Sequence, residues 1–135
     1  MIGFTLIDMK RITSIICLLI LFSCSKEISE PKLEERDGIK YEVNSTATFT
    51  GSSVNYYSDG QLKGKINYKD GKKDGLHESF YTVGKLRFKK NYKDGKLHGL
   101  SEEYHFNGQL HYRGNFKDGK EDGTHHSYHG NGQLL

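Results

Sequence analysis

Apolar, aromatic and glycine positions recur every 24 residues from Gly51 to the end of the sequence. The period is marked by four glycines, Gly51, Gly75, Gly99 and Gly123. An aromatic residue follows each of them at the same distance, at Tyr56, Phe80, Tyr104 and Tyr128. A second aromatic residue leads three times into Lys-Asp-Gly-Lys, at Tyr68, Tyr92 and Phe116. A fixed period of this length indicates a repeat architecture. We divide it into repeats 51–74, 75–98 and 99–122 and a partial repeat 123–135.

Each repeat contains two tight-turn signals between alternating, strand-like runs. Most of these signals are Asp-Gly or Asn-Gly, which favour type I′ turns between antiparallel strands. A lead-in unit at 38–50 begins with the alternating run Ile39 to Val43. The sequence therefore predicts an all-β fold, an elongated antiparallel β-meander of hairpin repeats. The strands are expected at 39–44, 47–58, 61–69, 73–82, 85–93, 97–106, 109–117 and 121–130.

The turns predict which side chains share a face of the sheet. A two-residue loop at Asp59-Gly60 would place Tyr57 opposite Leu62 and Tyr56 opposite Lys63. The face expected to be better buried carries Tyr57, Leu62, Ile66, Tyr68, Tyr81, Leu86, Phe88, Tyr92, Leu110, Tyr112 and Phe116. The wetter face carries an aromatic ridge with two leucines, namely Tyr56, Phe80, Tyr104, Tyr128, Leu76 and Leu100.

The N-terminal residues 1–23 have the pattern of a signal peptide. The apolar run 12–22 follows Lys10-Arg11 and is too short to span a membrane as a helix. Met9 is an alternative start. The next residues, Leu21-Phe22-Ser23-Cys24, resemble the bacterial lipobox, which implies that Cys24 is lipidated. The alternative is a single-pass anchor followed by an unrelated cysteine.

The resemblance to lipoproteins also implies a location. Ser25 after the cysteine resembles the signal for outer-membrane sorting in Gram-negative bacteria, so we expect a lipid-anchored protein of the cell envelope, in the outer membrane. Whether it faces the periplasm or the surface is open. Cys17 would leave with the signal peptide, so no disulfide can form within the mature chain. The charged segment 24–37 is expected to be a flexible tether, with a short helix at 31–36 as the alternative.

Composition narrows the possible partners. The chain has 9 Tyr and 7 Phe, which argues against disorder of the repeats, and its formal net charge is only +3. Acidic and basic residues alternate instead of forming a basic stripe, so nucleic acid is not an expected partner.

No catalytic or cofactor motif stands out. Equivalent histidines such as His105 and His129 would lie about 9–10 Å apart, too far to share one metal ion. Asp70 and Asp74 lie close together, but the alternating oxygen ligands and final Glu of an EF-hand are absent. We therefore expect a non-enzymatic protein without a cofactor or metal.

The segment Tyr112 to Gly123, YRGNFKDGKEDG, resembles the MORN repeat, in which two aromatics flank a glycine before Gly-Lys-x-x-Gly. The Tyr-Tyr-x-x-Gly-Gln-Leu and Asn-Tyr-Lys-Asp-Gly-Lys stretches are similar to a bacterial variant of this repeat, described as an antitoxin component of toxin–antitoxin systems. The resemblance covers residues 41–135 and implies a hairpin array that serves as an interaction scaffold. The fourth repeat stops at Leu135, so either the array is truncated or its 121–130 edge is a pairing site.

The favoured function is a lipid-anchored scaffold that binds a protein partner in the bacterial envelope. The candidate contacts are Tyr56, Phe80, Tyr104, Tyr128, His105 and His129. The alternatives are an antitoxin-like protein that neutralises a co-encoded toxin, and a protein that binds glycans at the cell surface. The aromatics could also serve only as cross-strand supports between neighbouring strands.

Overall fold

The computed structural model describes residues 26–135. The expected signal peptide, the alternative start at Met9 and the lipidation site Cys24 lie outside this range. Within it, no helix has the length and apolar character needed to cross a membrane.

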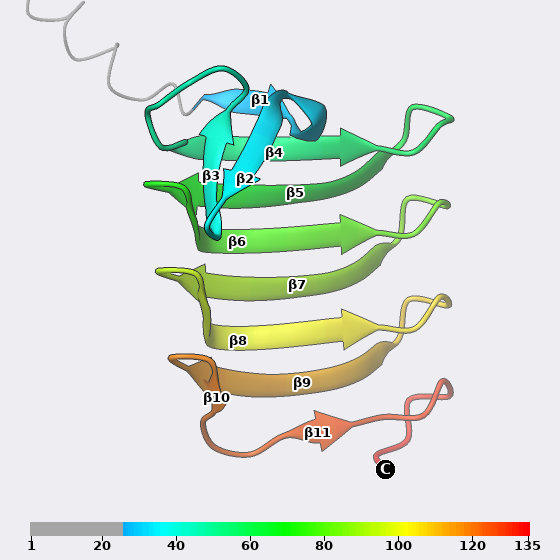
Figure 1. Cartoon of the computed structure of the whole chain (residues 1–135). Helices are drawn as coiled ribbons and strands as arrows, with labels where there is room; N and C mark the ends of the chain where they lie inside the picture. Colours follow the sequence, from blue (N-terminus) through cyan, green and yellow to red (C-terminus); the bar gives the residue numbers. More distant parts are fainter. Residues whose placement is uncertain (1–25) are drawn as a thin grey trace, which may run out of the picture.

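The repeats form one twisted meander in which each strand pairs with the next along the chain (Figure 1). The all-β antiparallel fold predicted from the sequence is confirmed. Six long strands make up the array: β4 (Gly51–Tyr56), β5 (Leu62–Lys69), β6 (Lys72–Phe80), β7 (Leu86–Lys93), β8 (Lys96–Tyr104) and β9 (Leu110–Lys117). All of the pairings between consecutive members are antiparallel.

The last strand is shorter than predicted. Instead of one strand at 121–130, two short pieces pair with β9, namely β10 (Lys120–Glu121) and β11 (His126–Ser127). Glu121 lies opposite Phe116, whereas His126 lies opposite Arg113, so four residues on one strand face two on the other. The two extra residues interrupt the pairing with β9 between β10 and β11.

Three of the predicted type I′ turns are confirmed, and they occupy one end of the sheet. Asp70, Asp94 and Asp118 have φ values of 50°, 48° and 52°, and each is followed by a glycine with positive φ. Each turn also bonds to the unit before it, which is the lead-in unit for the first turn and a repeat for the other two. The glycine N–H groups of the three turns donate to the carbonyls of Phe49, Lys73 and Leu97, at 2.7, 2.8 and 2.9 Å. The turns thereby connect successive repeats.

The turns at the other end differ from the prediction. Gly60 N–H bonds to the Tyr57 carbonyl at 3.0 Å and Tyr57 N–H bonds to the Gln61 carbonyl at 2.8 Å, which encloses a three-residue loop. Only the glycine has positive φ, as in a type I turn closed by a glycine bulge. The expected register was therefore wrong: Tyr56 lies opposite Leu62, and Lys63 is skipped.

The expected tether is also wrong for its described part. Residues 27–29 form β1 (Glu27–Ser29), which pairs in parallel with β4. A short 3₁₀ turn (Glu30–Lys32) then leads into β2 (Leu33–Arg36), which forms a hairpin with β3 (Ile39–Glu42). The hairpin closes through a type I′ turn at Asp37-Gly38, so the alternative of a helix at 31–36 is wrong as well.

The β2–β3 hairpin covers one face of the first repeat (Figure 1). Lys40 N–H donates to the Gly71 carbonyl at 2.9 Å, and Phe49 N–H donates to the Lys40 carbonyl at 2.9 Å. The buried hydrophobic side chains of the described residues are Phe49, Val54 and Tyr68. Of the face predicted to be better buried, only Tyr68 reaches this core, while Ile66, Phe88, Tyr92, Tyr112 and Phe116 are half-buried. The later repeats therefore depend on contacts between neighbouring strands.

Candidate functional site

The predicted aromatic ridge forms at the end of the sheet that carries the three-residue loops. Tyr56, Phe80 and Tyr104 are the last residues of β4, β6 and β8, and Tyr128 follows β11. The Tyr56 side chain is 52% exposed, and the other three are half-buried. Each lies opposite a leucine that follows the next loop, in the pairs Tyr56–Leu62, Phe80–Leu86, Tyr104–Leu110 and Tyr128–Leu134. These pairs support the sheet and still leave apolar surface at its end.

Two exposed apolar side chains at the same end were not predicted as contacts. Val83 and Phe106 lie in the three-residue loops and are 54% and 57% exposed. The Phe106 ring meets the Tyr81 ring edge-on at 5.3 Å between centroids. The sequence does contain a signal for these two contacts. The first repeat has polar residues at the equivalent loop positions, Asp59 for Val83 and Ser58 for Phe106. We call these six side chains the loop-end patch: Tyr56, Phe80, Tyr104, Tyr128, Val83 and Phe106.

The two candidate histidines have different environments. His105 Nε2 lies 2.9 Å from the Tyr128 carbonyl oxygen, and because a carbonyl can only accept, Nε2 carries the hydrogen in this bond. This bond occupies the place that the Tyr57 and Tyr81 hydroxyls fill in earlier repeats, so His105 joins neighbouring repeats. His129 directly precedes the last three-residue loop, and its side chain is exposed.

A row of alternating charges crosses the face beside the ridge. Direct cross-strand neighbours in this row are Lys65, Glu78, Lys89, Glu102 and Arg113. Arg113 donates to one Glu102 oxygen from Nε at 3.0 Å and from Nη2 at 2.8 Å, which raises the pKa of Arg113. The Tyr104 hydroxyl donates to the other Glu102 oxygen at 3.1 Å, and burial, followed by this contact, raises the Tyr104 pKa. Because the signs alternate, this face presents no basic stripe for a nucleic acid.

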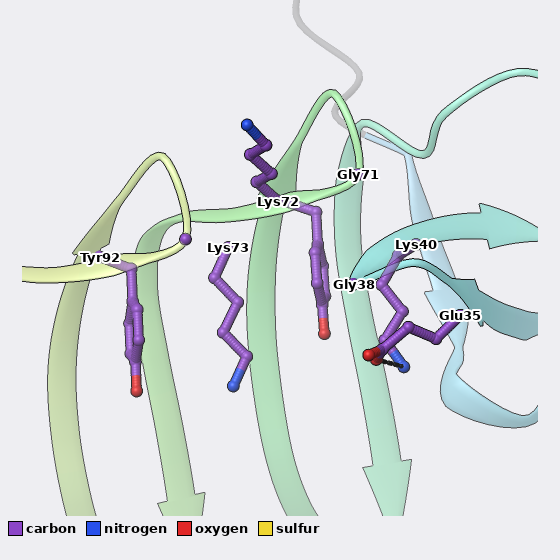
Figure 2. Close-up of a pocket in the computed structure, with 9 residues that line it drawn as sticks. Glu35, Gly38, Lys40, Gly71, Lys72, Lys73 and Tyr92 are labelled. Atoms are coloured by element: carbon purple, nitrogen blue, oxygen red, sulfur yellow. Dashed lines mark ion pairs between the residues drawn. The ribbon is translucent and has the colours of Figure 1, made fainter.

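A pocket lies at the opposite end, where the hairpin meets the sheet (Figure 2). Its volume is about 280 Å³. Lys40 Nζ lies 3.2 Å from Glu35 Oε2, and Lys73 Nζ lies 5.1 Å from the centre of the Tyr92 ring. Burial raises the pKa of the Tyr68 phenol to about 12. The lining residues are Glu35, Gly38, Lys40, Tyr68, Gly71, Lys72, Lys73, Tyr92 and Gly95.

The tether predicted for segment 24–37 leaves no place for this pocket. The sequence did contain the signal for the hairpin that covers the pocket. Asp37-Gly38 is a hairpin dipeptide, and it lies between Leu33 on one side and Ile39 and Tyr41 on the other. These two apolar runs around a hairpin turn predict the β2–β3 hairpin. They do not predict that the hairpin lies on the face of the first repeat.

The histidines do not assemble a metal site in the described part of the chain. Across residues 26–135, no three His, Cys, Asp or Glu side chains lie close enough together to hold a metal ion. The pKa of His77 lies well below that of an ordinary histidine. Burial, followed by the charges of Lys73 and Lys90, lowers its pKa to about 4, so it is neutral at pH 7. Its ring packs edge-on against Phe88 at 4.9 Å.

Comparison with known proteins agrees with this geometry. Three segments match the family model described as MORN repeat variant, at residues 49–70, 73–94 and 97–118. The chain contains three MORN repeats. Each matched segment spans one hairpin closed by a three-residue loop and ends at the Asp of a type I′ turn, namely Asp70, Asp94 or Asp118. No curated protein and no solved structure matched the chain. The fold and the three matched segments together show an array of β-hairpin repeats.

Proposed function

We propose that this chain is a non-enzymatic scaffold that binds a protein partner through the loop-end patch, while a lipid on Cys24 holds it in the bacterial cell envelope. The observation that carries the proposal is the concentration of exposed apolar side chains at one end of the array. Tyr56, Val83 and Phe106 are each more than half exposed, and they lie on the loop ends of successive hairpins.

Such an arrangement favours a protein partner with apolar side chains. Aromatic residues supply much of the energy of protein interfaces, because they bury large areas at a small entropic cost. The alternating charges beside the ridge would form a polar rim. This rim would select a partner whose charges pair with it one by one, and not a partner of a particular net charge. The repeat-to-repeat hydrogen bonds hold the patch in a fixed geometry, which lowers the cost of binding.

The proposed anchor would hold the folded domain close to the membrane. Strand β1 begins at Glu27, three residues after Cys24. Three residues of extended chain span at most about 11 Å. The edge of the sheet would therefore lie near the lipid surface, in contrast to a domain on a long tether. We place the protein in the outer membrane, by the resemblance of its N-terminus to sorted lipoproteins.

The anchor is tested by comparing wild type with Cys24→Ala in membrane fractions, with protease treatment of intact cells to report the orientation. We expect wild type in the outer membrane and the variant released or unprocessed. If both forms are cytosolic and uncleaved, the lipid anchor is wrong and the antitoxin alternative is favoured, because only then could the protein meet a cytosolic toxin.

The binding surface is tested by photo-cross-linking in cells. A photoreactive residue at Phe106 should cross-link to a discrete protein, and the same residue at Lys117 should not. Lys117 is a suitable control because it is exposed and lies at the opposite end of β9. Cross-linking from Lys117 alone would contradict the proposal. Retention on cell-wall glycans without a protein adduct would favour glycan binding instead.

A further inference from the structure

The pocket beneath the β2–β3 hairpin contains more positive than negative side chains. Lys40, Lys72 and Lys73 line it together with one acid, Glu35, so three positive charges less one negative leaves +2. Glu35 is already engaged, since its carboxylate lies 3.2 Å from Lys40 Nζ. The remaining positive charge of the pocket is carried by Lys73 and by the exposed Lys72.

Lys73 is the cation that faces into this space without an acidic partner. Among residues 26–135, no carboxylate lies within ion-pair distance of its ammonium group. Its ammonium group makes a cation–π contact with the Tyr92 ring, whose centre lies 5.1 Å from Nζ. Figure 2 shows the two side chains running alongside each other, while Lys72 extends away from them. Lys73 therefore offers an ammonium group beside an apolar wall.

The repeat does not require a lysine at this position. One period later the chain has Leu97, which lies opposite Tyr92 in the same way that Lys73 lies opposite Tyr68. The hairpin covers the first repeat, and the pocket is lined from both the hairpin and the sheet. The one repeat with this pocket thus has a lysine where the next has an apolar residue.

We propose that this pocket binds a carboxylate of an acidic peptide segment, with Lys73 as the charged contact and Tyr92 as the apolar wall. A volume of about 280 Å³ is at the small end for ligand pockets, and suits one side chain instead of a whole cofactor. The Lys40–Glu35 pair shows that a carboxylate fits beside a lysine of this pocket.

The electrostatics farther along β6, the strand that carries Lys73, agree with an anionic ligand. The charges of Lys73 and Lys90 act on His77 in the direction that disfavours a further positive charge. Although Lys90 is neutralised by Glu103 at 2.6 Å, Lys73 is not. The pocket is separate from the loop-end patch, so the two proposals can fail independently.

The test is an NMR titration of the full-length chain in micelles of a non-ionic detergent. The probes are acetyl-Gly-Glu-Gly-amide, its Gln analogue and inorganic phosphate, and the readout is the amide shifts of Lys73 and Gly95. We expect saturable shifts with the Glu peptide, with at least 10-fold weaker binding of the Gln peptide and of phosphate. Lys73→Leu should weaken binding of the Glu peptide at least 10-fold, and Lys117→Leu should change it less than 2-fold.

The variants distinguish lost binding from lost folding. Lys73→Leu places at this position the residue that the next repeat already has, and Lys73→Gln provides a second variant that keeps a polar side chain. Both should retain the circular dichroism and melting temperature of wild type. The proposal is overturned if the Gln peptide binds as well as the Glu peptide, if either Lys73 variant binds normally, or if phosphate binds more tightly than the Glu peptide.

Discussion

The Tyr57 hydroxyl donates a hydrogen bond of 2.7 Å to the carbonyl oxygen of Phe80, in the following repeat. The same contact recurs one period later, where the Tyr81 hydroxyl donates to the Tyr104 carbonyl at 2.8 Å. His105 makes it once more with the Tyr128 carbonyl at 2.9 Å. These bonds join the loop end of each hairpin to the next, as the turn glycines do at the other end. Hydrogen bonds therefore connect successive repeats at both ends of their strands.

Removing one of these hydroxyls should destabilise the array modestly. Tyr81→Phe leaves the Tyr104 carbonyl without this donor, and the expected loss in the free energy of unfolding is about 1 kcal/mol. Urea denaturation measures it. Tyr56→Phe is the matched control, because the Tyr56 side chain is 52% exposed, and it should cost less than about 0.5 kcal/mol. Equal losses in the two variants would show that the bond contributes nothing specific.

Docking of the hairpin can be isolated with two glycines at equivalent turn positions. Gly71 and Gly95 have similar φ values, +77° and +83°, so alanine at either should cost roughly 1–2 kcal/mol in backbone strain. A Cβ at Gly71 would also collide with Ile39 Cγ2 and lie 2.8 Å from the Lys40 carbonyl oxygen, whereas at Gly95 the nearest atom is 3.9 Å away.

Gly71→Ala should therefore be less stable than Gly95→Ala by about 1–3 kcal/mol, the usual cost of overpacking. It should also raise amide hydrogen exchange in the β2–β3 hairpin, while Gly95→Ala should leave that exchange unchanged. Equal stability of the two variants would show that the hairpin does not pack against Gly71.

The loop at Val83 should gain stability from a polar residue. In the equivalent loops, the side-chain oxygens of Asp59 and Asn107 accept the N–H of Gln61 and Gln109 at 3.0 Å each. Val83 has no such acceptor, so Val83→Asn should add this bond to the Lys85 N–H and raise stability by about 0.5–1 kcal/mol. The melting temperature measures it. The reciprocal Asp59→Val should lower stability by a similar amount, and a lower melting temperature for Val83→Asn would contradict the argument.

Stability should fall in acid because of His77. Its pKa is lowered to about 4 in the folded protein from an ordinary value of 6.5, so between these values the unfolded chain binds more protons. The stability that neutral His77 provides is present above pH 6.5 and is lost as the pH falls towards 4. We expect a loss on the order of 1 kcal/mol, allowing for solvent screening.

Denaturation from pH 7 to pH 4 measures this loss. His77→Gln should flatten the pH dependence in this window, and His111→Gln should not, because the His111 side chain is exposed. An unchanged profile for His77→Gln would assign the acid sensitivity to other groups.

The repeat architecture was predictable because its signals are local and recur. Asp70-Gly71 and its two equivalents specify type I′ turns through their own φ preferences, and the structure has them there. The register at Asp59-Gly60 was not predictable from the dipeptide alone. The same two residues also suit a three-residue loop that begins at Ser58, and the added residue moves Tyr56 opposite Leu62.

The pocket and part of the patch depend on contacts that no local pattern specifies. The hairpin covers the sheet because Gly71 leaves room for Ile39, and these residues are far apart in the sequence. His105 was predicted as a partner contact from its repeat position beside Tyr104. Its side chain also takes the place of a tyrosine hydroxyl, a role visible only once the carbonyl of Tyr128 is placed beside it.

The measurement that most directly tests partner binding by the loop-end patch is quantitative capture of the cross-linked partner by wild type and by the Phe80→Ser, Tyr104→Ser double variant. Both substituted side chains lie in the ridge, and neither is among the buried hydrophobic side chains. The double variant should lose capture while its circular dichroism retains the strand signal of wild type. Unchanged capture by the folded double variant would contradict the assignment of the partner surface to this end of the array.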